Sequence, residues 1–460
     1  MAYSALAITL IAGGAFFVPI CAQERAVQVV TLTTLYDLAD RQSQKVRVSE
    51  VALRAADEGV AAAKSALLPS VDLNLQGSYT GNALMLSRGF SSSGTTDYIV
   101  PGVGTVPVAN GKQDTPHWGN SFTAQVSQVV YAGGAIRSGI RMAELSKEMA
   151  ELDVEKNRQE VRFLLTGYYL DLCKLDNQME VVRQNIALTQ KEIEQMKARR
   201  GEGTVLQNDI TRYEFQLQSL ELTLTKLKDA STVINHQLVT TLHLPEQTVI
   251  VPDKNELDTE INALSAIAAQ ETWQQTAADN NLGIRQATVA TNLAEQKVKQ
   301  VKAESLPSVA VVAENQLYGP YTQDLIPKDC NVNVWFVGIG VKFSIGSLWK
   351  NKHNIRKARI EHQQSQEALA LAHEEVENGV QANYTNLLTS YTEVKTQQKQ
   401  VELANQNYSV VQNRYQNELA LLTDMVDASN MKLSAEMAQV NARIGMLYNF
   451  YKLKYVTNTL

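Results

Sequence analysis

The sequence contains few residues that interrupt helices. Only 10 of its 460 residues are proline, and these are clustered: none lies between Pro116 and Pro245, and none follows Pro327. Two long stretches therefore lack the strongest helix breaker. Aromatic residues make up only 7% of the chain, which suits long helices better than large compact cores. These features predict an extended, mainly helical protein.

The chain also lacks the residue clusters that most enzymes and metalloproteins need. Its cysteines, Cys21, Cys173 and Cys330, are isolated, so neither a disulfide framework nor a zinc-site spacing is present. The histidines are dispersed, and His236 and His243, which share a helix face, have no carboxylate or cysteine cluster beside them. No Walker motif occurs. We therefore expect no catalytic residue, no metal and no cofactor.

Charge and hydrophobicity restrict the class further. The formal net charge of -6 argues against a nucleic-acid partner, which would require a basic surface. After the N-terminus no segment approaches the roughly 18 apolar residues of a membrane-spanning helix. Residues 1–22 are predicted to be a signal peptide, apolar from Ala5 to Ile20 and cleaved after Ala22, although a basic segment is missing before the apolar run. Lipidation of Cys21 is the less favoured alternative, because the residue before a lipidated cysteine is normally small.

The sequence does contain an internal repeat. Leu68-Pro69-Ser70-Val71 recurs as Leu306-Pro307-Ser308-Val309, and further matches follow on both sides of a loop of variable length. We expect a first structural repeat at 23–244, an equatorial linker at 245–268 and a second repeat at 269–460. An internal repeat of this size indicates a two-fold repeated architecture.

Each repeat carries a pair of long heptad seams. In the first repeat the seams run from Val161 to Met196 and from Ile210 to Leu238, with a tip at about 199–208 that contains two glycines. In the second repeat they run from about Ile355 to Tyr451, with a tip at about 414–423. Both patterns predict antiparallel helical hairpins. A coiled-coil spacer without a channel is the alternative that these heptads allow.

Each repeat also carries two segments with the alternating pattern of a strand, at about 70–80, 120–132, 308–318 and 332–346. About ten residues is the length of a tilted strand that crosses a membrane. Four strands cannot close a barrel, and a spanning sheet has no open edge in lipid, so strands from identical neighbours are required. The alternative is a soluble four-stranded sheet covered on one face by helices. Export and aromatic strand ends favour the membrane, with Tyr131, Trp335 and Trp349 as predicted interface residues.

With these features together, the chain resembles the TolC family of trimeric outer-membrane efflux channels. The resemblance rests on the repeated Leu-Pro-Ser strand, the two long hairpins and Arg414-Tyr415 followed by Asp424 and Asp427. It implies an α+β membrane protein: a homotrimer with a twelve-stranded outer-membrane β-barrel, four strands per chain, continuous with a periplasmic α-helical barrel of coiled-coil hairpins. It also implies a Gram-negative outer membrane and its lipid as surroundings, and a periplasmic adaptor and an inner-membrane transporter of the resistance-nodulation-division or ATP-binding cassette type as partners.

The resemblance points to the hairpin tips as the functional site. Asp424 and Asp427, and less strongly Asp209, would form acidic rings of a periplasmic gate, although helix capping explains Asp424 and Asp209 equally simply. The remaining predicted residues are gate or tip partners, namely Arg199, Arg200, Arg212, Arg414 and Tyr415, and adaptor-docking residues, namely Gly201, Gly203, Thr204, Glu418, Leu419 and Leu422. Glu418 departs from the glycine that is usual in the family's second tip, and Ala420 from an arginine found in some members.

Three functions remain open from the sequence. The first is a passive efflux channel that is opened at its tip by adaptor and pump. The second is the exit duct of a type I protein secretion system, because the pump decides the cargo. The third is an exported coiled-coil protein that conducts nothing. A basic cluster after Trp349, from Lys350 to Arg359, is interpreted either as a contact with lipid headgroups or as a solvated helix face.

Overall fold

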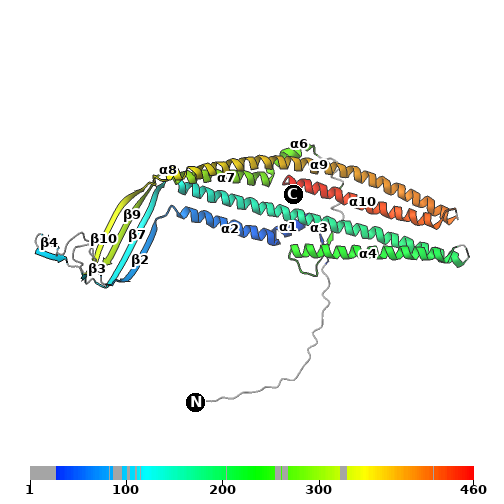
Figure 1. Ribbon diagram of the computed structural model, residues 1–460. Coiled ribbons are helices and arrows are strands. Elements are labelled where there is room, and N and C mark those ends of the chain that lie inside the picture. The colour runs from blue at the N-terminus through cyan, green and yellow to red at the C-terminus, as the bar shows by residue number, and fades with distance from the viewer. Residues whose placement is uncertain are drawn as a thin grey trace, which may run out of the picture.

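The computed structural model describes residues 27–81, 83–85, 96–100, 104–108, 111–113, 116–201, 203, 205–253, 259, 261, 268–321, 329–417 and 419–460. The predicted signal peptide, Thr204, Glu418 and part of the predicted linker lie outside these residues. The molecule is elongated: a β-sheet occupies one end, and the turns of the long helical hairpins occupy the other (Figure 1).

The two halves of the chain contain helices of matching length. Each half begins with a helix of 11 residues followed by one of 22 residues, and each ends with a helix of 35 residues. The longest helices have 67 residues in the first half and 65 in the second. The bounds are α1 Leu32–Gln42, α2 Gln44–Ser65, α3 Ala135–Gly201, α4 Gln207–Thr241, α6 Gln270–Asn280, α7 Leu282–Ala303, α9 Lys352–Gln416 and α10 Leu422–Val456, with a single turn of helix, α8, at Ser347–Lys350.

Local capping explains where several of these helices begin. The Thr31 hydroxyl accepts a hydrogen bond from the Thr34 N–H at 3.3 Å at the start of α1. The Asn281 Oδ1 accepts from the N–H groups of Gly283 and Ile284 at 2.8 and 3.2 Å at the start of α7. Both caps satisfy first-turn amides that have no partner within the helix. The chain therefore breaks between α6 and α7 without a proline.

The long helix α3 packs against more helices than a single heptad seam could contact. It lies beside α2 and α7 in the half nearer the sheet and beside α4 and α10 in the half nearer the tips (Figure 1). Its buried residues accordingly include positions outside the predicted seam, among them Thr166, Tyr169, Leu170, Gln178 and Asn185. A helix with partners on several sides buries a wider stripe than the two positions per heptad of a simple coiled coil.

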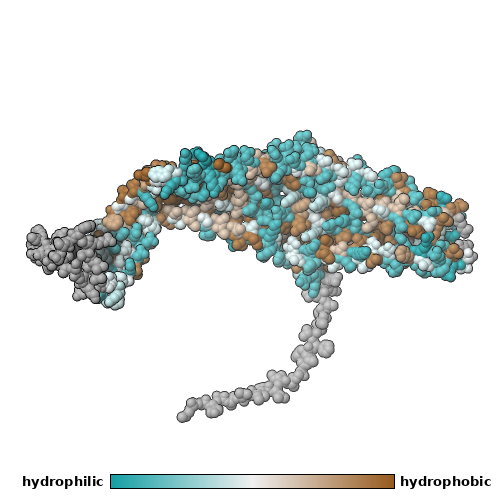
Figure 2. Space-filling model, viewed as in Figure 1, coloured by the Kyte–Doolittle hydropathy of each residue, from teal (hydrophilic) through white to brown (hydrophobic). Residues whose placement is uncertain are grey.

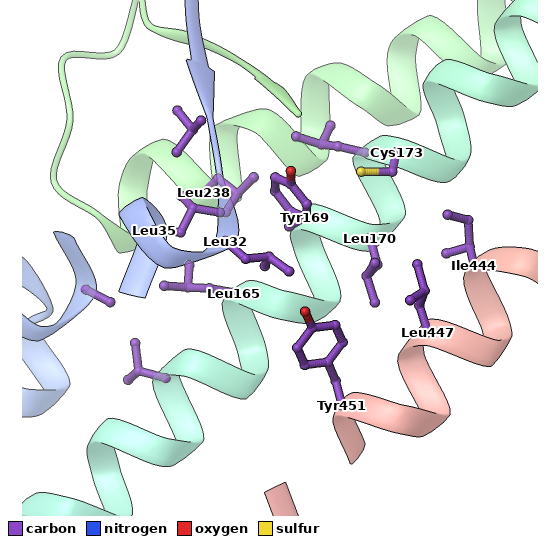
Figure 3. Close-up of a cluster of buried hydrophobic side chains, with 14 of the residues drawn as sticks. Leu32, Leu35, Leu165, Tyr169, Leu170, Cys173, Leu238, Ile444, Leu447 and Tyr451 are labelled. Atoms are coloured by element: carbon purple, nitrogen blue, oxygen red, sulfur yellow. The ribbon is translucent and has the colours of Figure 1, made fainter. Parts of the chain in front are cut away.

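The largest hydrophobic core lies at mid-length, where both halves of the chain meet. Leu32 and Leu35 from α1 pack against Leu165, Tyr169 and Leu170 of α3, and Leu238, Ile444, Leu447 and Tyr451 arrive from α4 and α10 (Figure 3). The Tyr169 hydroxyl also accepts a hydrogen bond from the Asp253 N–H at 3.1 Å. A parallel pair of short strands, β1 Val27–Val30 and β8 Val249–Pro252, lies next to this core. The equatorial region is thus fixed by buried apolar side chains.

The main sheet has four antiparallel strands in the order β10-β9-β7-β2. Their bounds are β2 Ser70–Tyr79, β7 Trp118–Ala132, β9 Ser308–Gly319 and β10 Val332–Lys342. The predicted extension of the last strand to residue 346 is wrong: Lys342 pairs with Ser308, the first residue of β9, and the preceding Pro307 has no N–H to extend the ladder. A bulge leaves Val130 unpaired in β7.

The register gives this sheet one strongly apolar face. Residues directly opposite each other in neighbouring strands lie on the same face, so Ile339, Val311, Gln128 and their equivalents form one side. That side is mainly apolar in all four strands. Its polar members are Asn120, Gln128, Asn315 and Asn333, and its apolar members are Val71, Leu73, Leu75, Phe122, Ala124, Val126, Val309, Val311, Ala313, Leu317, Trp335, Val337, Ile339 and Val341. The other side carries the polar residues of β2 and β7 with Glu314, Gln316 and Lys342, together with the apolar Val312, Val334 and Phe336. No helix covers the apolar face in the part of the chain that is described, and Leu75 and Ile339 are 80% and 74% exposed.

Four short strands lie beyond the far end of the sheet, within the segment between β2 and β7. They form two antiparallel pairs, β3 Ala83–Met85 with β6 Gly111–Gln113 and β4 Thr96–Val100 with β5 Gly104–Val108. Among the described residues, no helix is both long enough and apolar enough to cross a membrane.

Candidate functional site at the tips of the hairpins

The turns of the two helical hairpins lie side by side at the end opposite the sheet (Figure 1). The first turn joins Gly201 to Gln207 and the second joins Gln416 to Leu422. A shared apolar cluster holds them together: Ile193, Met196, Val205, Ile210 and Tyr213 from the first hairpin, and Tyr408, Leu422, Met425 and Ala428 from the second. Leu422, predicted to dock an adaptor, therefore lies buried in the packing between the hairpins.

The first turn requires a glycine. Gly203 has a φ of +80°, a left-handed conformation that glycine adopts without strain, and its N–H donates to the Arg200 carbonyl at 2.9 Å. Gly201 is the last residue of α3. Arg200 and Arg212 are exposed around this turn, whereas Asp209 is half-buried at the start of α4.

The second turn is held by an arginine rather than by a glycine. The Arg414 guanidinium donates to the Leu419 carbonyl at 3.1 Å, and the Leu419 N–H donates to the Arg414 carbonyl at 2.8 Å. The Asn417 side chain adds a 2.7 Å bond to the Asn413 carbonyl. Arg414 therefore stabilises its own turn through backbone hydrogen bonds. The sequence predicts it as a partner of the tip carboxylates instead.

Asp424 caps the helix that it begins. It is the third residue of α10, and its Oδ2 accepts from the Leu421 N–H at 3.1 Å. This is one half of a capping box, because the leucine side chain has no acceptor with which to complete the other half. The carboxylate is exposed and favours the positive end of the helix dipole. Asp427 lies one turn later and is also exposed.

A groove of about 550 Å³ between α4 and α10 brings two of the predicted residues together. Arg212 lines it from the first hairpin and Asp427 from the second, with Phe215 and Val426 as its apolar walls. Neither Asp424 nor Asp427 forms an ion pair with the described part of the chain. Side chains of opposite charge therefore face a common groove in the single subunit.

Three tyrosines and one glutamate form a buried polar centre just behind the tips. Burial, followed by the negative charge of Glu192, raises the pKa of Tyr213 and Tyr408 above the ordinary value. The pKa of Tyr415 is raised by burial first and then by Asp209, against a lowering effect of Arg199. Asp209 and Arg199 are thus close enough to Tyr415 to influence its pKa.

A ladder of polar pairs joins the two hairpins and was missed in the sequence. Gln178, Asn185 and Glu192 are buried at seven-residue intervals on α3. The Gln178 amide donates to Asn441 at 2.7 Å, the Asn185 amide to Glu436 at 3.1 Å, and the Gln412 amide to Glu192 at 2.7 Å. The heptad spacing of the three polar residues was the available signal. A single seam along this helix does not include these positions, because they face the second hairpin.

The predicted membrane-interface residues lie at the other end of the molecule. Tyr131 and Trp335 belong to the apolar face of the sheet, near opposite ends of its strands, and Trp349 follows in α8. Trp118, which was not singled out, pairs with Tyr79 at the far end of the same face and is 77% exposed. Aromatic side chains therefore flank the apolar band at both ends, as in outer-membrane barrels.

The described residues contain no group of three or more histidine, cysteine or acidic side chains arranged to hold a metal ion. Of the two described cysteines, Cys173 is buried in the core at mid-length and Cys330 is exposed.

Comparison with known proteins gives the family. A model described as outer membrane efflux protein matches residues 35–242 and 273–458. Because these residues make up most of the chain, it belongs to the outer membrane efflux protein family. Its relatives are channels rather than enzymes.

Individual relatives agree with this result. The outer membrane protein TolC of Salmonella enteritidis is 19% identical over 441 residues, which cover 94% of this chain and 83% of TolC. Among solved structures, the outer membrane protein VceC of Vibrio cholerae aligns with a TM-score of 0.70 at 16% identity, covering 93% of this chain and 95% of VceC. CusC, whose structures concern transmembrane channel formation, aligns with a TM-score of 0.74 at 13% identity, covering 93% and 91%.

Membership also gives the location. The protein resides in the outer membrane of a Gram-negative cell and has a long periplasmic extension. The helical hairpins form that extension, so the tips point away from the outer membrane.

Proposed function

We propose that three copies of this chain form one passive efflux channel, with a twelve-stranded barrel in the outer membrane and a helical tunnel in the periplasm. The observation that carries the proposal is the open four-stranded sheet with one apolar face. Among the described residues, β2 and β10 each present an unpaired edge, and an unpaired edge is not stable in lipid. Joining β10 of one copy to β2 of the next satisfies both edges and leaves the apolar face toward lipid.

The matching helix lengths support two duplicated units within each subunit, so that the tunnel wall has approximate six-fold symmetry. With 67 residues, α3 extends for roughly 100 Å at about 1.5 Å per residue. A channel of this length opens deep in the periplasm, where a pump in the inner membrane can supply it through an adaptor. The channel itself needs no energy source.

The tips are the proposed gate. Repeated around the trimer axis, Asp424 and Asp427 would form two acidic rings, with Arg212 facing Asp427 across the α4–α10 groove. The exposed parts of the turns at 199–208 and 414–423 would meet the helical hairpins of an adaptor. A transporter of the resistance-nodulation-division or ATP-binding cassette type would complete the system.

The experiment is conductance of the purified full-length protein in planar bilayers, combined with its mass in detergent. We expect a trimer and discrete single-channel currents that favour cations. Replacement of Asp427 by Asn should weaken that preference, whereas the same change at Asp229, a residue of α4 far from the tips, should leave it unaltered. A monodisperse monomer, or a trimer that conducts no current under any condition, would contradict the proposal.

A further inference from the structure

Six basic side chains lie within the ten-residue stretch 350–359, which follows the last strand of the sheet. They are Lys350, Lys352, His353, Arg356, Lys357 and Arg359, here called the basic collar, and all six are exposed. Within the described chain only Lys357 has an acidic partner, Glu361 at 3.5 Å. Most of the positive charge of the collar is therefore left uncompensated by the subunit itself.

The basic collar continues directly from the apolar face of the sheet. After β10 the exposed apolar side chains Ile345, Leu348 and Trp349 extend this surface up to Lys350. Figure 2 shows the result: a hydrophobic area over β10 adjoins a strongly hydrophilic area over α8 and the start of α9. Apolar surface, tryptophan and positive charge follow one another in the order of a membrane interface.

The dimensions agree with this order. The 11 residues of β10, at about 3.3 Å each and tilted by about 40°, cross roughly 28 Å, close to the apolar band of about 25 Å of outer-membrane barrels. The end of β10 then lies near the periplasmic border of the hydrocarbon, with Ile345, Leu348 and Trp349 at the interface. From Lys352 to Arg359 the helix rises by roughly 10 Å, a distance that takes in the headgroup layer.

The orientation of the collar is fixed by packing on its other side. Asn351 and Ala358, seven residues apart, are buried. The Asn351 amide donates to the Val301 carbonyl at 2.7 Å and to the Ser305 hydroxyl at 3.1 Å at the end of α7. Since α9 cannot rotate without breaking these bonds, His353, Arg356 and Lys357 stay on the side turned away from α7.

We propose that the basic collar binds the phosphate headgroups of anionic phospholipids in the periplasmic leaflet of the outer membrane. The inference rests on the proposed function for the position of the bilayer. Phospholipid phosphate matches the collar in charge, and its acyl chains match the adjoining apolar surface. A soluble anion would match only the charge.

The test uses Trp349 as a reporter in the full-length protein. Trp118, Trp273 and Trp335 are replaced by Phe, and the protein is reconstituted with brominated phosphatidylglycerol or brominated phosphatidylcholine, which quench a neighbouring tryptophan. We expect the anionic lipid to be preferred at Trp349 by at least about fivefold, the factor for a single basic residue near an anionic surface. The triple variant Lys352→Gln, Arg356→Gln, Lys357→Gln should abolish the preference, and 1 M salt should weaken it.

The matched control removes the same charge elsewhere. Lys226, Lys395 and Lys399 are exposed on α4 and α9 away from the sheet, and their replacement by Gln should leave the preference intact. Equal quenching by both lipids, equal loss in both triple variants, or displacement by 10 mM inorganic phosphate would overturn the proposal. Equal quenching would be the outcome if carboxylates of a neighbouring subunit covered the collar.

Two further measurements separate the possible failures. If the background with one tryptophan does not fold, mass spectrometry of phospholipids that copurify with the collar variant and the control variant decides the same question. Conductance measured in the same liposomes tests the channel independently: current without lipid preference overturns only the collar, and lipid preference without current overturns only the proposed function.

Discussion

Arg162 of α3 and Asp40 of α1 form an ion pair of 2.5 Å at mid-length, with both side chains only about a quarter exposed. A second nitrogen of Arg162 donates to the backbone oxygen of Leu460 at 3.1 Å, and the guanidinium lies over the Tyr36 ring at 5.8 Å. One arginine therefore ties the first helix and the end of the chain to the longest helix.

Replacing Arg162 by Ala should destabilise the protein by about 2–3 kcal/mol, because it leaves the half-buried Asp40 carboxylate without its cation. The control is Arg183→Ala, which removes an exposed ion pair with Glu180 at 3.7 Å and should cost less than about 1 kcal/mol. Urea unfolding followed by circular dichroism measures both. Equal losses of stability in the two variants would show that the Arg162–Asp40 ion pair contributes no more than an exposed pair.

Asp424 has two interpretations that two variants separate. Asp424→Asn keeps an acceptor for the Leu421 N–H but removes the charge, whereas Asp424→Ala removes both and should cost about 1 kcal/mol of stability. If the carboxylate belongs to a gate, both variants lower cation selectivity in planar bilayers. A role limited to capping would leave the Asn variant with the selectivity and stability of the natural protein.

Alkaline pH should weaken the packing behind the tips. The pKa of Tyr213 is raised in the folded protein, first by burial, so above the ordinary value of 10.0 the unfolded chain releases a proton that the folded chain retains. Stability from this tyrosine is present below pH 10 and is lost as the pH rises. Tyr213→Phe should reduce the loss by about 1.4 kcal/mol per pH unit, while Tyr448→Phe, at a side chain 38% exposed, should not. Denaturation between pH 9 and 11 gives the slopes, and identical slopes would refute the prediction.

The same Tyr213→Phe variant should be as stable as the natural protein at pH 7, or slightly more so. The Tyr213 hydroxyl is buried without a hydrogen-bond partner among the described residues, so its removal takes away a desolvation cost and no bond.

The ladder between the hairpins predicts a non-additive pair. Glu192→Ala leaves the Gln412 amide without its acceptor and should cost about 1–3 kcal/mol, whereas the double change Glu192→Leu, Gln412→Leu should come close to neutral. Hydrogen exchange of α9 near the tip reports the opening of this contact. Additive losses in the double variant would mean that the pair is not coupled.

Adjacent valines on opposite faces of β9 test the orientation of the sheet. Val311 pairs with Ile339 on the apolar face, and Val312 pairs with Gly338 on the other. Val311→Arg should cost roughly 1–3 kcal/mol in a bilayer, and Val312→Arg should be tolerated and alter conductance. Folding yield into liposomes measures the first effect and single-channel current the second. The reverse ranking would mean that the apolar face does not meet lipid.

Features that depend on neighbours in sequence were accessible before the structure. The seam predicted from Val161 to Met196 lies within the helix Ala135–Gly201, because the absence of proline and the heptads act locally. The strand predicted at about 70–80 is observed at Ser70–Tyr79, because the alternation of apolar and polar residues is also a local signal.

Features that depend on distant partners were not accessible. β10 ends at Lys342 because its partner β9 begins at Ser308, and no residue of β10 itself carries that information. The pairing of β1 with β8 joins segments more than two hundred residues apart. At the tips, the sequence predicts Arg414 as a partner of the tip carboxylates. In the structure its guanidinium donates to the Leu419 carbonyl instead, because the turn brings this oxygen within reach.

The two open edges of the four-stranded sheet have a consequence for the life of each newly made subunit. If three copies assemble as proposed, each subunit first passes through an aqueous compartment with an exposed apolar sheet surface and two rows of backbone donors and acceptors that await their partners, the features that promote aggregation. On that proposal, we expect unassembled subunits to require holding chaperones and to be degraded when they do not assemble. Overproduction should raise the demand on this quality control before it raises the number of finished pores.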